Sequence, residues 1–245
     1  SFSSKSFKGS NWYTTENYIN SLSIPKDINI CIMINASQII MQNNLESAVK
    51  KIFVKKNKSK VHLVRVASHF HELDKTFKII KIIKKLGYKV ALNLMQISEL
   101  SEKDLVNISH NIQKNKPDIF YFADSLGSLD PIKIRKIIKN IKTYWKGEIG
   151  FHAHDNLGKA ILNTKEAINL GVKWVDSTVT GMGRGPGNVQ TEYFLLEINN
   201  DFKKNYKILP ILKLIKKHFD KLKDKYKWGT NSHYYLAGMY GIHPT

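Results

Sequence analysis

Cysteine is nearly absent from this sequence of 245 residues, in which Cys31 stands alone. No disulfide can therefore form within the chain. Cys31 lies in the apolar run 30–34, where we expect a small core residue and not a nucleophile. No stretch approaches about 18 consecutive apolar residues, and no apolar segment of signal-peptide type follows the first residues. These absences predict a cytoplasmic protein with no membrane partner.

Arginine is scarce too, although the net charge of +19 is strongly positive. The 39 basic residues include three arginines, Arg65, Arg135 and Arg184, whereas the readout of base edges in nucleic acids favours the arginine fork. Many lysines, such as Lys75 and Lys78, fall on solvent positions of expected amphipathic helices, and no nucleic-acid-binding motif accompanies them. We therefore interpret the charge as a solvated surface and predict no nucleic-acid partner.

Two phosphate-binding motifs are also missing. No G-x-G-x-x-G follows an early strand, and no Gly-Lys-Ser/Thr follows a glycine loop, which argues against a dinucleotide-binding sheet and against a nucleotide P-loop. What is present is a rhythm of apolar, β-branched runs that recur roughly every 30 residues, the length of one βα unit. The six runs are 30–34, 61–66, 90–95, 119–122, 149–151 and 174–175.

The segments between these runs have helical periodicity. Each begins near a residue that favours a helix N-terminus, and Gly87 and Gly171 are placed to end two of the helices. The expected starts lie at or just after Asp74, Ser101, Asp130 and Asn156. Ser101 and Asp104 have the spacing of a capping box, and Asp130 is followed by proline in the preferred order of cap and then proline.

The strand runs are continuously apolar, which is typical of parallel strands buried on both faces. Polar residues end most of the runs: Asn35, Arg65, Asn93, Asp124, His152 with His154, and Asp176. Because such groups would converge on one mouth, we favour a (β/α)8 TIM barrel over an open doubly wound sheet. Six units are two fewer than a barrel needs, so we expect the first two strands to be missing from this chain.

This interpretation divides the chain into two domains. Residues 1–200 would form the barrel, as its strands 3 to 8, and residues 201–245 would form a C-terminal helical extension that is itself cut short. The extension contains an expected basic amphipathic helix at 211–226 and an aromatic, glycine-punctuated tail.

The segment 150–188 contains the residues that point most directly to chemistry. His152 and His154 lie two apart in an expected strand, so their imidazoles point to the same side. They stand at the carboxyl end of that strand, where parallel α/β folds place catalytic groups. Two imidazoles with oxygen ligands and open positions suit a divalent ion such as Mn²⁺, Mg²⁺, Co²⁺ or Zn²⁺. The alternative is a pair of core histidines with satisfied hydrogen bonds.

Four glycines at alternate positions follow, from Gly181 to Gly187. They would let the backbone approach a ligand closely, and they would offer N–H groups to an anion of the substrate at Gly183 and Gly185. The alternative is a plain flexible turn.

Three signatures stand in order at intervals of one strand: Phe-Ala-Asp-Ser-Leu-Gly at 122–127, Phe-His-Ala-His-Asp-Asn at 151–156, and Val-Asp-Ser-Thr-Val-Thr-Gly-Met-Gly-Arg-Gly-Pro-Gly-Asn at 175–188. Together they resemble the metal-dependent barrel lyases and aldolases, the group that includes 4-hydroxy-2-oxovalerate aldolase, hydroxymethylglutaryl-CoA lyase and isopropylmalate synthase. The resemblance covers roughly residues 28–200. The glycine loop and the tail Trp-Gly-Thr-Asn are most similar to the bacterial aldolase-type members.

The resemblance implies Mn²⁺ or Mg²⁺ as the cofactor, with the amide oxygen of Asn188 as a third metal ligand. Asn188 could instead serve only the geometry of a tight loop. It also implies that Tyr235 and Tyr240 lie where related aldolases place a catalytic tyrosine, which orients the substrate and assists proton transfer. The alternative is that these rings dock the tail by aromatic packing.

Three further residues are candidates for substrate binding. The resemblance places Asp124 and Ser125 at the substrate pocket, although both could simply cap the following turn. Arg65 ends an otherwise apolar strand, where an inward arginine is costly unless it meets a carboxylate. That carboxylate could belong to the substrate or to the protein.

The function that we infer is a divalent-metal-dependent aldolase, a carbon–carbon lyase that cleaves or forms 4-hydroxy-2-oxo acids through a pyruvate enolate and an aldehyde. The alternatives are an acyl-CoA-dependent Claisen-type synthase or CoA-ester lyase of the same group, and a non-catalytic barrel. The expected partner is a small 2-oxo acid, with a homo-oligomer or a partner dehydrogenase as further possibilities. The group's first strand carries Arg-Asp-Gly, which this sequence lacks, so we expect the chain by itself to be inactive.

Overall fold

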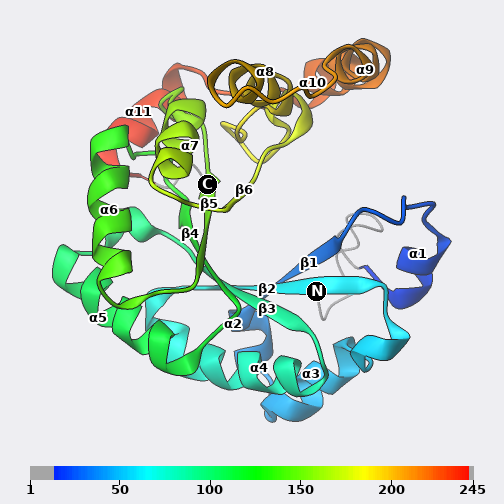
Figure 1. Ribbon diagram of the computed structural model, residues 1–245, viewed down its shortest axis with the longest axis vertical. Helices are drawn as coiled ribbons and strands as arrows, with labels where there is room; N and C mark the ends of the chain where they lie inside the picture. Colours follow the sequence, from blue (N-terminus) through cyan, green and yellow to red (C-terminus); the bar gives the residue numbers. More distant parts are fainter. Residues whose placement is uncertain (1–13, 243–245) are drawn as a thin grey trace. The chain divides into compact units, whose positions relative to one another are not determined.

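The computed structural model describes residues 14–242. Six strands form one sheet in the order of the sequence, and the pairs β1–β2, β2–β3 and β5–β6 are parallel (Figure 1). The strands are β1 (Ile30–Asn35), β2 (Val61–Ser68), β3 (Lys89–Leu94), β4 (Ile119–Asp124), β5 (Glu148–Ala153) and β6 (Trp174–Val175). The six predicted strand runs are thus confirmed, and their alternation with helices fits part of a (β/α) barrel.

Helices follow or connect the strands throughout the described chain. They are α1 (Glu16–Ser21), α2 (Ala36–Ile40), α3 (Leu45–Ile52), α4 (Leu73–Lys85), α5 (Glu102–Asn115), α6 (Pro131–Tyr144), α7 (Ala160–Asn169), α8 (Thr191–Asp201), α9 (Leu209–Leu214), α10 (Asp220–Tyr226) and α11 (Ser232–Tyr240). The chain divides into two compact units, one of residues 1–95 with 111–121 and the other of residues 96–110 with 122–245.

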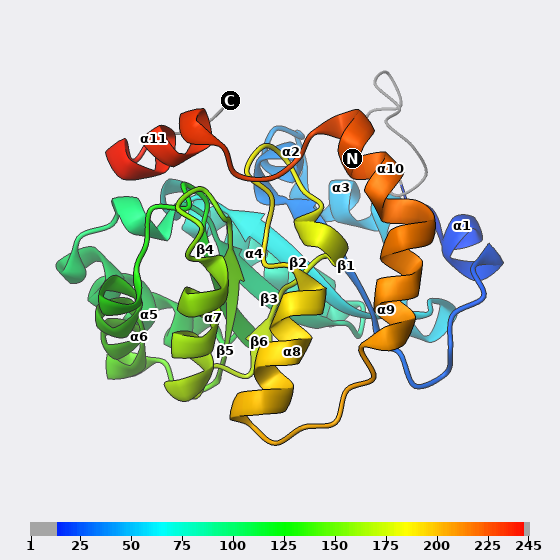
Figure 2. The same cartoon turned by 90° about the horizontal axis from the view of Figure 1, so that it is seen from above.

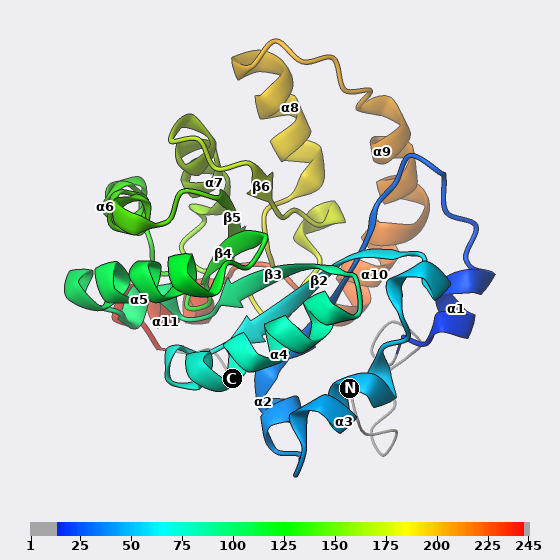
Figure 3. The same ribbon diagram turned by 60° about the horizontal axis from the view of Figure 1, so that its bottom comes forward.

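In the first unit, β2 and β3 pair with Arg65 opposite Ala91. Helix α4 packs along both strands (Figure 3). It contributes side chains with no exposed surface, namely Ile79, Ile80 and Ile83. A second buried cluster is formed by Leu63, Ala91, Ile119 and Tyr121. Because successive side chains of a strand alternate between faces, Arg65 lies on the same face of β2 as Leu63.

Strand β1 departs from the expectation that the strands are buried on both faces. Its side chains alternate between half-buried and exposed, and Met33 is 59% exposed. The side chain of Cys31 is exposed, so the prediction of a core cysteine is wrong. The reason is that β1 ends the sheet of the described strands and pairs with β2 alone. In β4, which has a neighbour on each side, all six residues are buried.

In the second unit, β5 and β6 pair with Gly150 opposite Trp174 and Phe151 opposite Val175. Phe122 of β4 stacks on Phe151, with their ring centroids 4.8 Å apart. Helices α6 and α7 pack side by side (Figure 1). The isoleucines that α6 buries are Ile134, Ile137, Ile138 and Ile141. This packing fixes the carboxyl ends of β4, β5 and β6, from which the candidate site is built.

Local hydrogen bonds confirm two of the predicted helix starts. Ser101 and Asp104 form the capping box, since the Asp104 amide donates to Ser101 Oγ at 3.2 Å and the Ser101 amide donates to the Asp104 carboxylate at 3.3 Å. The Lys133 amide donates to Asp130 Oδ1 at 2.9 Å, with proline following the cap. Gly87 has φ +94° just after α4, as a C-terminal stop requires.

Helix α7 begins later than predicted. Its first residue is Ala160 and not a residue next to Asn156. The carboxylate of Asp155 accepts a hydrogen bond from the Ala160 amide at 3.0 Å, which closes a turn before the helix starts. Helix α4 begins at Leu73, one residue before Asp74. These shifts are small, but the first leaves Asn156 in a loop, where it makes contacts described with the site.

The predicted helix 211–226 is present as α9, a π-helical turn (Ile215–Phe219) and α10 in direct succession. None of its residues is buried. A helix long and apolar enough to cross a membrane is not found within residues 14–242. The boundary between barrel and extension after residue 200 stays a prediction.

Candidate metal centre

The histidine pair lies at the carboxyl end of β5. His152 is in the strand and His154 follows its last residue, Ala153. The two imidazole rings are edge-on to each other, with centroids 5.1 Å apart and an angle of 78° between their planes. Both side chains therefore lie on one side of the strand end, as the two-residue spacing predicts. At this separation one ion between the rings could be bound by a nitrogen of each.

Asp176 orients one of these histidines. It follows β6, which pairs with β5, so its carboxylate reaches His152, where Oδ2 lies 2.8 Å from Nδ1. The two side chains are about a quarter exposed, at 26% for His152 and 24% for Asp176. A hydrogen bond from Nδ1–H to a carboxylate fixes the ring and leaves the lone pair of Nε2 free for a metal. This carboxylate–histidine arrangement is typical of ligating histidines.

Asn188 lies beside the pair because its backbone forms an isolated antiparallel bridge with His154. The Asn188 amide nitrogen donates to the carbonyl of Met182 at 3.3 Å. Its Oδ1 atom is buried and has no hydrogen-bond partner among the residues that the structure describes. Burying an amide oxygen without a partner costs about 1–3 kcal/mol, which a bond to a metal would offset.

The glycine loop, residues 181–188, has a backbone that side chains would obstruct. Gly181, Gly185 and Gly187 have φ of +69°, +52° and +78°. A Cβ atom on Gly183 would lie 2.3 Å from the amide nitrogen of Asn188, and one on Gly187 would lie 2.4 Å from the carbonyl oxygen of Gly181. The glycines therefore shape the loop and set the position of the Asn188 side chain. Substrate binding at Gly183 and Gly185 stays a prediction.

These observations test whether the residues fit a divalent metal. Two imidazoles with one orphaned amide oxygen form a mixed nitrogen and oxygen donor set, which suits Mn²⁺, Co²⁺ or Zn²⁺ and leaves positions open for water or substrate. Within the described part of the chain, no three His, Cys, Asp or Glu side chains gather in a metal-binding arrangement. The candidate centre thus consists of His152, His154 and Asn188, and the residues present fit the ion.

Asp124 and Ser125 end β4 and hold the backbone around them. Asp124 is completely buried, and its carboxylate accepts hydrogen bonds from the amides of Ser128 and Leu129, each at 3.1 Å. Burial raises the pKa of Asp124 to about 6, against the opposing effect of these backbone hydrogen bonds. Ser125 Oγ accepts from the amide of Gln96 at 3.0 Å. The contacts of Asp124 are those of the capping alternative, whereas Ser125 bonds to the loop after β3 and not to the following turn; the substrate role of both residues stays a prediction.

Arg65 belongs to the first unit. Its guanidinium donates to Asn93 Oδ1 at 2.8 Å and stacks over the ring of Tyr121, with Cζ 3.8 Å from the ring centroid. The stacking orients the planar guanidinium group of Arg65, and the side-chain oxygen of Asn93 accepts a hydrogen bond from one of its N–H donors. Whether Arg65 meets a substrate carboxylate stays a prediction.

The two predicted catalytic tyrosines lie on α11, where Tyr235 is 45% and Tyr240 is 73% exposed. The neighbouring Tyr234, which the sequence did not single out, lies against the glycine loop instead. A Cβ atom on Gly185 would be 3.1 Å from the Tyr234 ring. Figure 2 shows the segment before α11 crossing this loop. Catalytic roles for Tyr235 and Tyr240 stay predictions.

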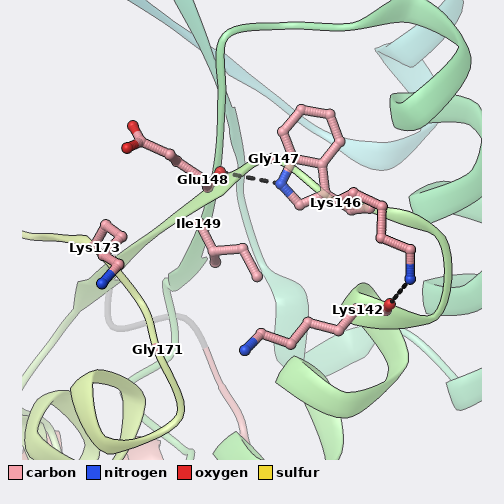
Figure 4. A pocket seen from close by; sticks show the side chains of 8 residues that line it. Lys142, Lys146, Gly147, Glu148, Ile149, Gly171 and Lys173 are labelled. Carbon is pink, nitrogen blue, oxygen red and sulfur yellow. Dashed lines mark hydrogen bonds between the residues drawn. The ribbon is translucent and has the colours of Figure 1, made fainter.

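A surface pocket in the second unit lies away from these residues (Figure 4). It is next to Glu148, the first residue of β5, and so at the opposite end of the strand from the histidines. Its lining residues are Lys142, Trp145, Lys146, Gly147, Glu148, Ile149, Gly171 and Lys173. The amino groups of Lys142 and Lys146 donate to the backbone carbonyls of Leu170 and Lys142.

Comparison with known proteins agrees with these features. The HMGL-like family model matches residues 14–215. The chain is 39% identical over 130 residues to a 4-hydroxy-2-oxovalerate aldolase of Carboxydothermus hydrogenoformans, which is 53% of this chain and 39% of that protein. It is 37% identical over 133 residues to a 4-hydroxy-2-oxovalerate aldolase of Bacillus thuringiensis, covering 54% and 39%. The chain spans about two fifths of the length of these curated relatives.

Two solved structures extend the comparison. The N-terminal domain of a candidate aldolase from Bacteroides vulgatus superposes with a TM-score of 0.85 at 30% identity, covering 100% of this chain and 79% of that one. The carboxyl transferase domain of Rhizobium etli pyruvate carboxylase, solved with pyruvate, gives a TM-score of 0.68 at 14% identity over 87% of this chain and 39% of that one, which shows a shared fold. The family match and the aldolase relatives together establish that this chain belongs to the HMGL-like family of metal-dependent aldolases and lyases.

Proposed function

We propose that this protein is a divalent-metal-dependent aldolase that cleaves or forms 4-hydroxy-2-oxo acids. One observation carries the proposal. His152, which is hydrogen-bonded to Asp176, lies beside His154. The backbone of His154 pairs with that of Asn188, whose Oδ1 atom is buried with no hydrogen-bond partner among the described residues. These residues, from β5, from the position after it and from the glycine loop, are neighbours at the end of the sheet where parallel α/β enzymes carry out their chemistry, which supports a metal site there. Relatives that bear the name 4-hydroxy-2-oxovalerate aldolase support the choice of substrate class.

The reaction breaks the bond between C3 and C4 of the substrate. The C4 hydroxyl loses its proton, the aldehyde leaves, and the electron pair of the broken bond moves through C3 and C2 to the 2-oxo oxygen. A bound divalent ion would stabilise the negative charge on that oxygen by several kcal/mol, as Lewis acids do. Protonation at C3 then gives pyruvate.

The chain's own residues have defined tasks in this scheme. His152 and His154 would hold the ion through ring nitrogens, and Asn188 would hold it through its amide oxygen. Asp176 keeps His152 in the tautomer that presents Nε2, because its carboxylate accepts the Nδ1 proton. Asp124 keeps the loop after β4 in place through its two amide hydrogen bonds.

The test begins with metal binding. Replacing His152 or His154 with alanine should remove most of the affinity for Mn²⁺, measured by metal analysis after dialysis. His110, which packs on Tyr144 in the same unit, provides a control, since His110→Ala removes an imidazole away from the site. Unchanged metal content in both site variants would show that the pair consists of core histidines.

The second measurement concerns the enolate. A complete enzyme that contains these residues, given pyruvate, Mn²⁺ and heavy water, should exchange the methyl protons of pyruvate without CoA and without an aldehyde, which proton NMR detects. The His152→Ala variant should fall to the rate of Mn²⁺ alone. Exchange that requires acyl-CoA would instead favour a Claisen-type synthase or CoA-ester lyase of the same family.

A further inference from the structure

We infer that residues 228–238 act as a strap that fixes the glycine loop and so positions Asn188 for the metal, with Trp228 as the main positioning residue. This inference rests on the proposed function. The strap follows the last described strand, β6, by about 50 residues and lies in the predicted C-terminal extension. The path from the strap to the metal has three steps: a strained residue held at the loop entrance, a tail anchored by hydrogen bonds, and backbone hydrogen bonds that reach Asn188.

The first step is at Thr180, where the glycine loop begins. Thr180 has φ +54° and ψ +20°, a left-handed conformation that is rare for a β-branched residue. Both of its backbone polar groups are fixed: its amide donates to the buried carboxylate of Glu192 at 2.9 Å, and its carbonyl accepts from Trp228 Nε1 at 3.0 Å. Such strain persists only where surrounding contacts impose it. Trp228, itself 7% exposed, is one of the two groups that do so.

The second step is the anchoring of the tail. After Trp228, the amide of Gly229 donates to the carbonyl of Gly185 at 3.0 Å, in the middle of the glycine loop. Thr230 Oγ1 then donates to the carbonyl of Asn156 at 2.7 Å, and the Asn156 amide donates back to the carbonyl of Tyr234 at 3.3 Å. Asn156 is fully buried, so these bonds tie the tail to the loop that follows β5.

Close packing completes the anchor. A Cβ atom on Gly238 would lie 2.9 Å from Cβ of Asn156, and one on Gly127 would lie 2.3 Å from Asn156 Oδ1. Helix α11 and the loop after β4 therefore both pack against Asn156, so closely that a methyl group would not fit at either contact. The Tyr234 ring covers Gly185 from the same tail.

The third step connects the strap to the metal donors. The amide of Asn188 donates to the carbonyl of Gly181 at 3.1 Å, directly after the strained Thr180. The amide of Asp155, next to His154, donates to the carbonyl of Gly187 at 3.1 Å. A displacement of residues 180 and 181 would therefore move Asn188 away from the histidines. Since the loop carries three glycines with positive φ, its own backbone offers little resistance to that movement.

The experiment measures the Mn²⁺ affinity of strap variants by calorimetric titration. Trp228→Phe keeps an aromatic ring but removes the donor to Thr180, and Thr230→Val replaces the hydroxyl with a methyl group. The matched controls make the same chemical changes elsewhere in the second unit. Trp174→Phe removes an indole donor to Glu148, and Thr143→Val removes a hydroxyl donor to a helix carbonyl. The titrations are repeated with all four changes in an Asn188→Ala background.

We expect Trp228→Phe to weaken Mn²⁺ binding about tenfold, as the loss of outer contacts around a metal site typically does, and Thr230→Val to weaken it less. The controls should stay within about twofold of the wild type. In the Asn188→Ala background the strap variants should cause no further loss, because the donor that they position is already absent.

Equal affinities of Trp228→Phe and Trp174→Phe would overturn the strap. So would a loss of affinity that persists in the Asn188→Ala background, because it would reflect general destabilisation. If His152→Ala bound Mn²⁺ as tightly as the wild type, the proposed metal site itself would be refuted, and the strap with it. Failure of the strap alone is therefore distinguishable from failure of the proposed function.

Discussion

Gly183 offers a direct test of how the glycine loop serves Asn188. Its φ lies outside the left-handed region, so alanine can adopt the same backbone conformation. The obstacle is a side chain: the new Cβ would lie 2.3 Å from the Asn188 amide nitrogen, whereas its distance to Gly187 Cα would be an ordinary 3.4 Å. Normal contact requires the amide to retreat by roughly 1 Å. Metal–ligand distances tolerate deviations of about 0.2 Å, so Asn188 would be lost as a ligand.

Gly183→Ala should therefore weaken Mn²⁺ binding about tenfold while leaving the melting temperature nearly unchanged. Gly158→Ala is the matched control. Gly158 has φ +64° and nothing within 4 Å of its Cβ position, so alanine there should cost about 1 kcal/mol of stability and leave the metal affinity unchanged. In an Asn188→Ala background the obstacle disappears, and Gly183→Ala should have no effect on affinity. Equal effects of Gly183→Ala in both backgrounds would refute the reasoning.

Two further predictions concern carboxylates. Asp176→Asn should lower Mn²⁺ affinity by about 10–100-fold in a titration, because His152 loses the acceptor that fixes its tautomer; an affinity equal to the wild type would exclude that role. Asp124 has a folded pKa of about 6, above its ordinary 3.8, so its contribution to stability is fully present below pH 3.8 and is lost as the pH rises through 6. The stability of the wild type relative to Asp124→Asn, from urea unfolding, should be about 1.4 kcal/mol greater at pH 5 than at pH 8; a flat or opposite trend would contradict the burial argument.

The sequence predicted the strands and the histidine pair because both depend on local order. Continuous apolar runs mark strands wherever both faces are buried, and a two-residue spacing places His152 and His154 on one side whatever surrounds them. The prediction failed for Cys31 because the burial of an end strand depends on its neighbours in the sheet, which a run of apolar residues does not encode. The late start of α7 has a similar cause, since Asp155 and Asn156 both look like caps, whereas in the structure Asp155 closes a turn ahead of the helix and the N-cap position falls on Lys159.

The outer residues of the site were harder to predict. Asp176 was predicted as one of the polar residues that end the strands, but not as the partner of His152, although it follows the strand that pairs with the histidine strand and the ends of paired strands are neighbours. Trp228 and Tyr234 had no comparable signal: their contacts to Thr180 and Gly185 span roughly 50 residues and arise from how the tail folds back. Tyr235 and Tyr240 were singled out by the family resemblance, and their catalytic roles stay predictions; the structure adds Tyr234, whose ring lies against the glycine loop.

The strained threonine at the loop entrance has a consequence for protein engineering. A glycine would adopt the backbone of Thr180 without strain, so Thr180→Gly relieves about 1–3 kcal/mol of strain against roughly 0.5–1 kcal/mol of added entropy in the unfolded chain, and selection scored on melting temperature should favour it. The same exchange would give the loop entrance freedom to adopt conformations that carry Asn188 elsewhere. Thermal stability and the correct placement of Asn188 are thus opposing demands on residue 180. A thermostabilised version of this protein should be screened for both melting temperature and Mn²⁺ affinity.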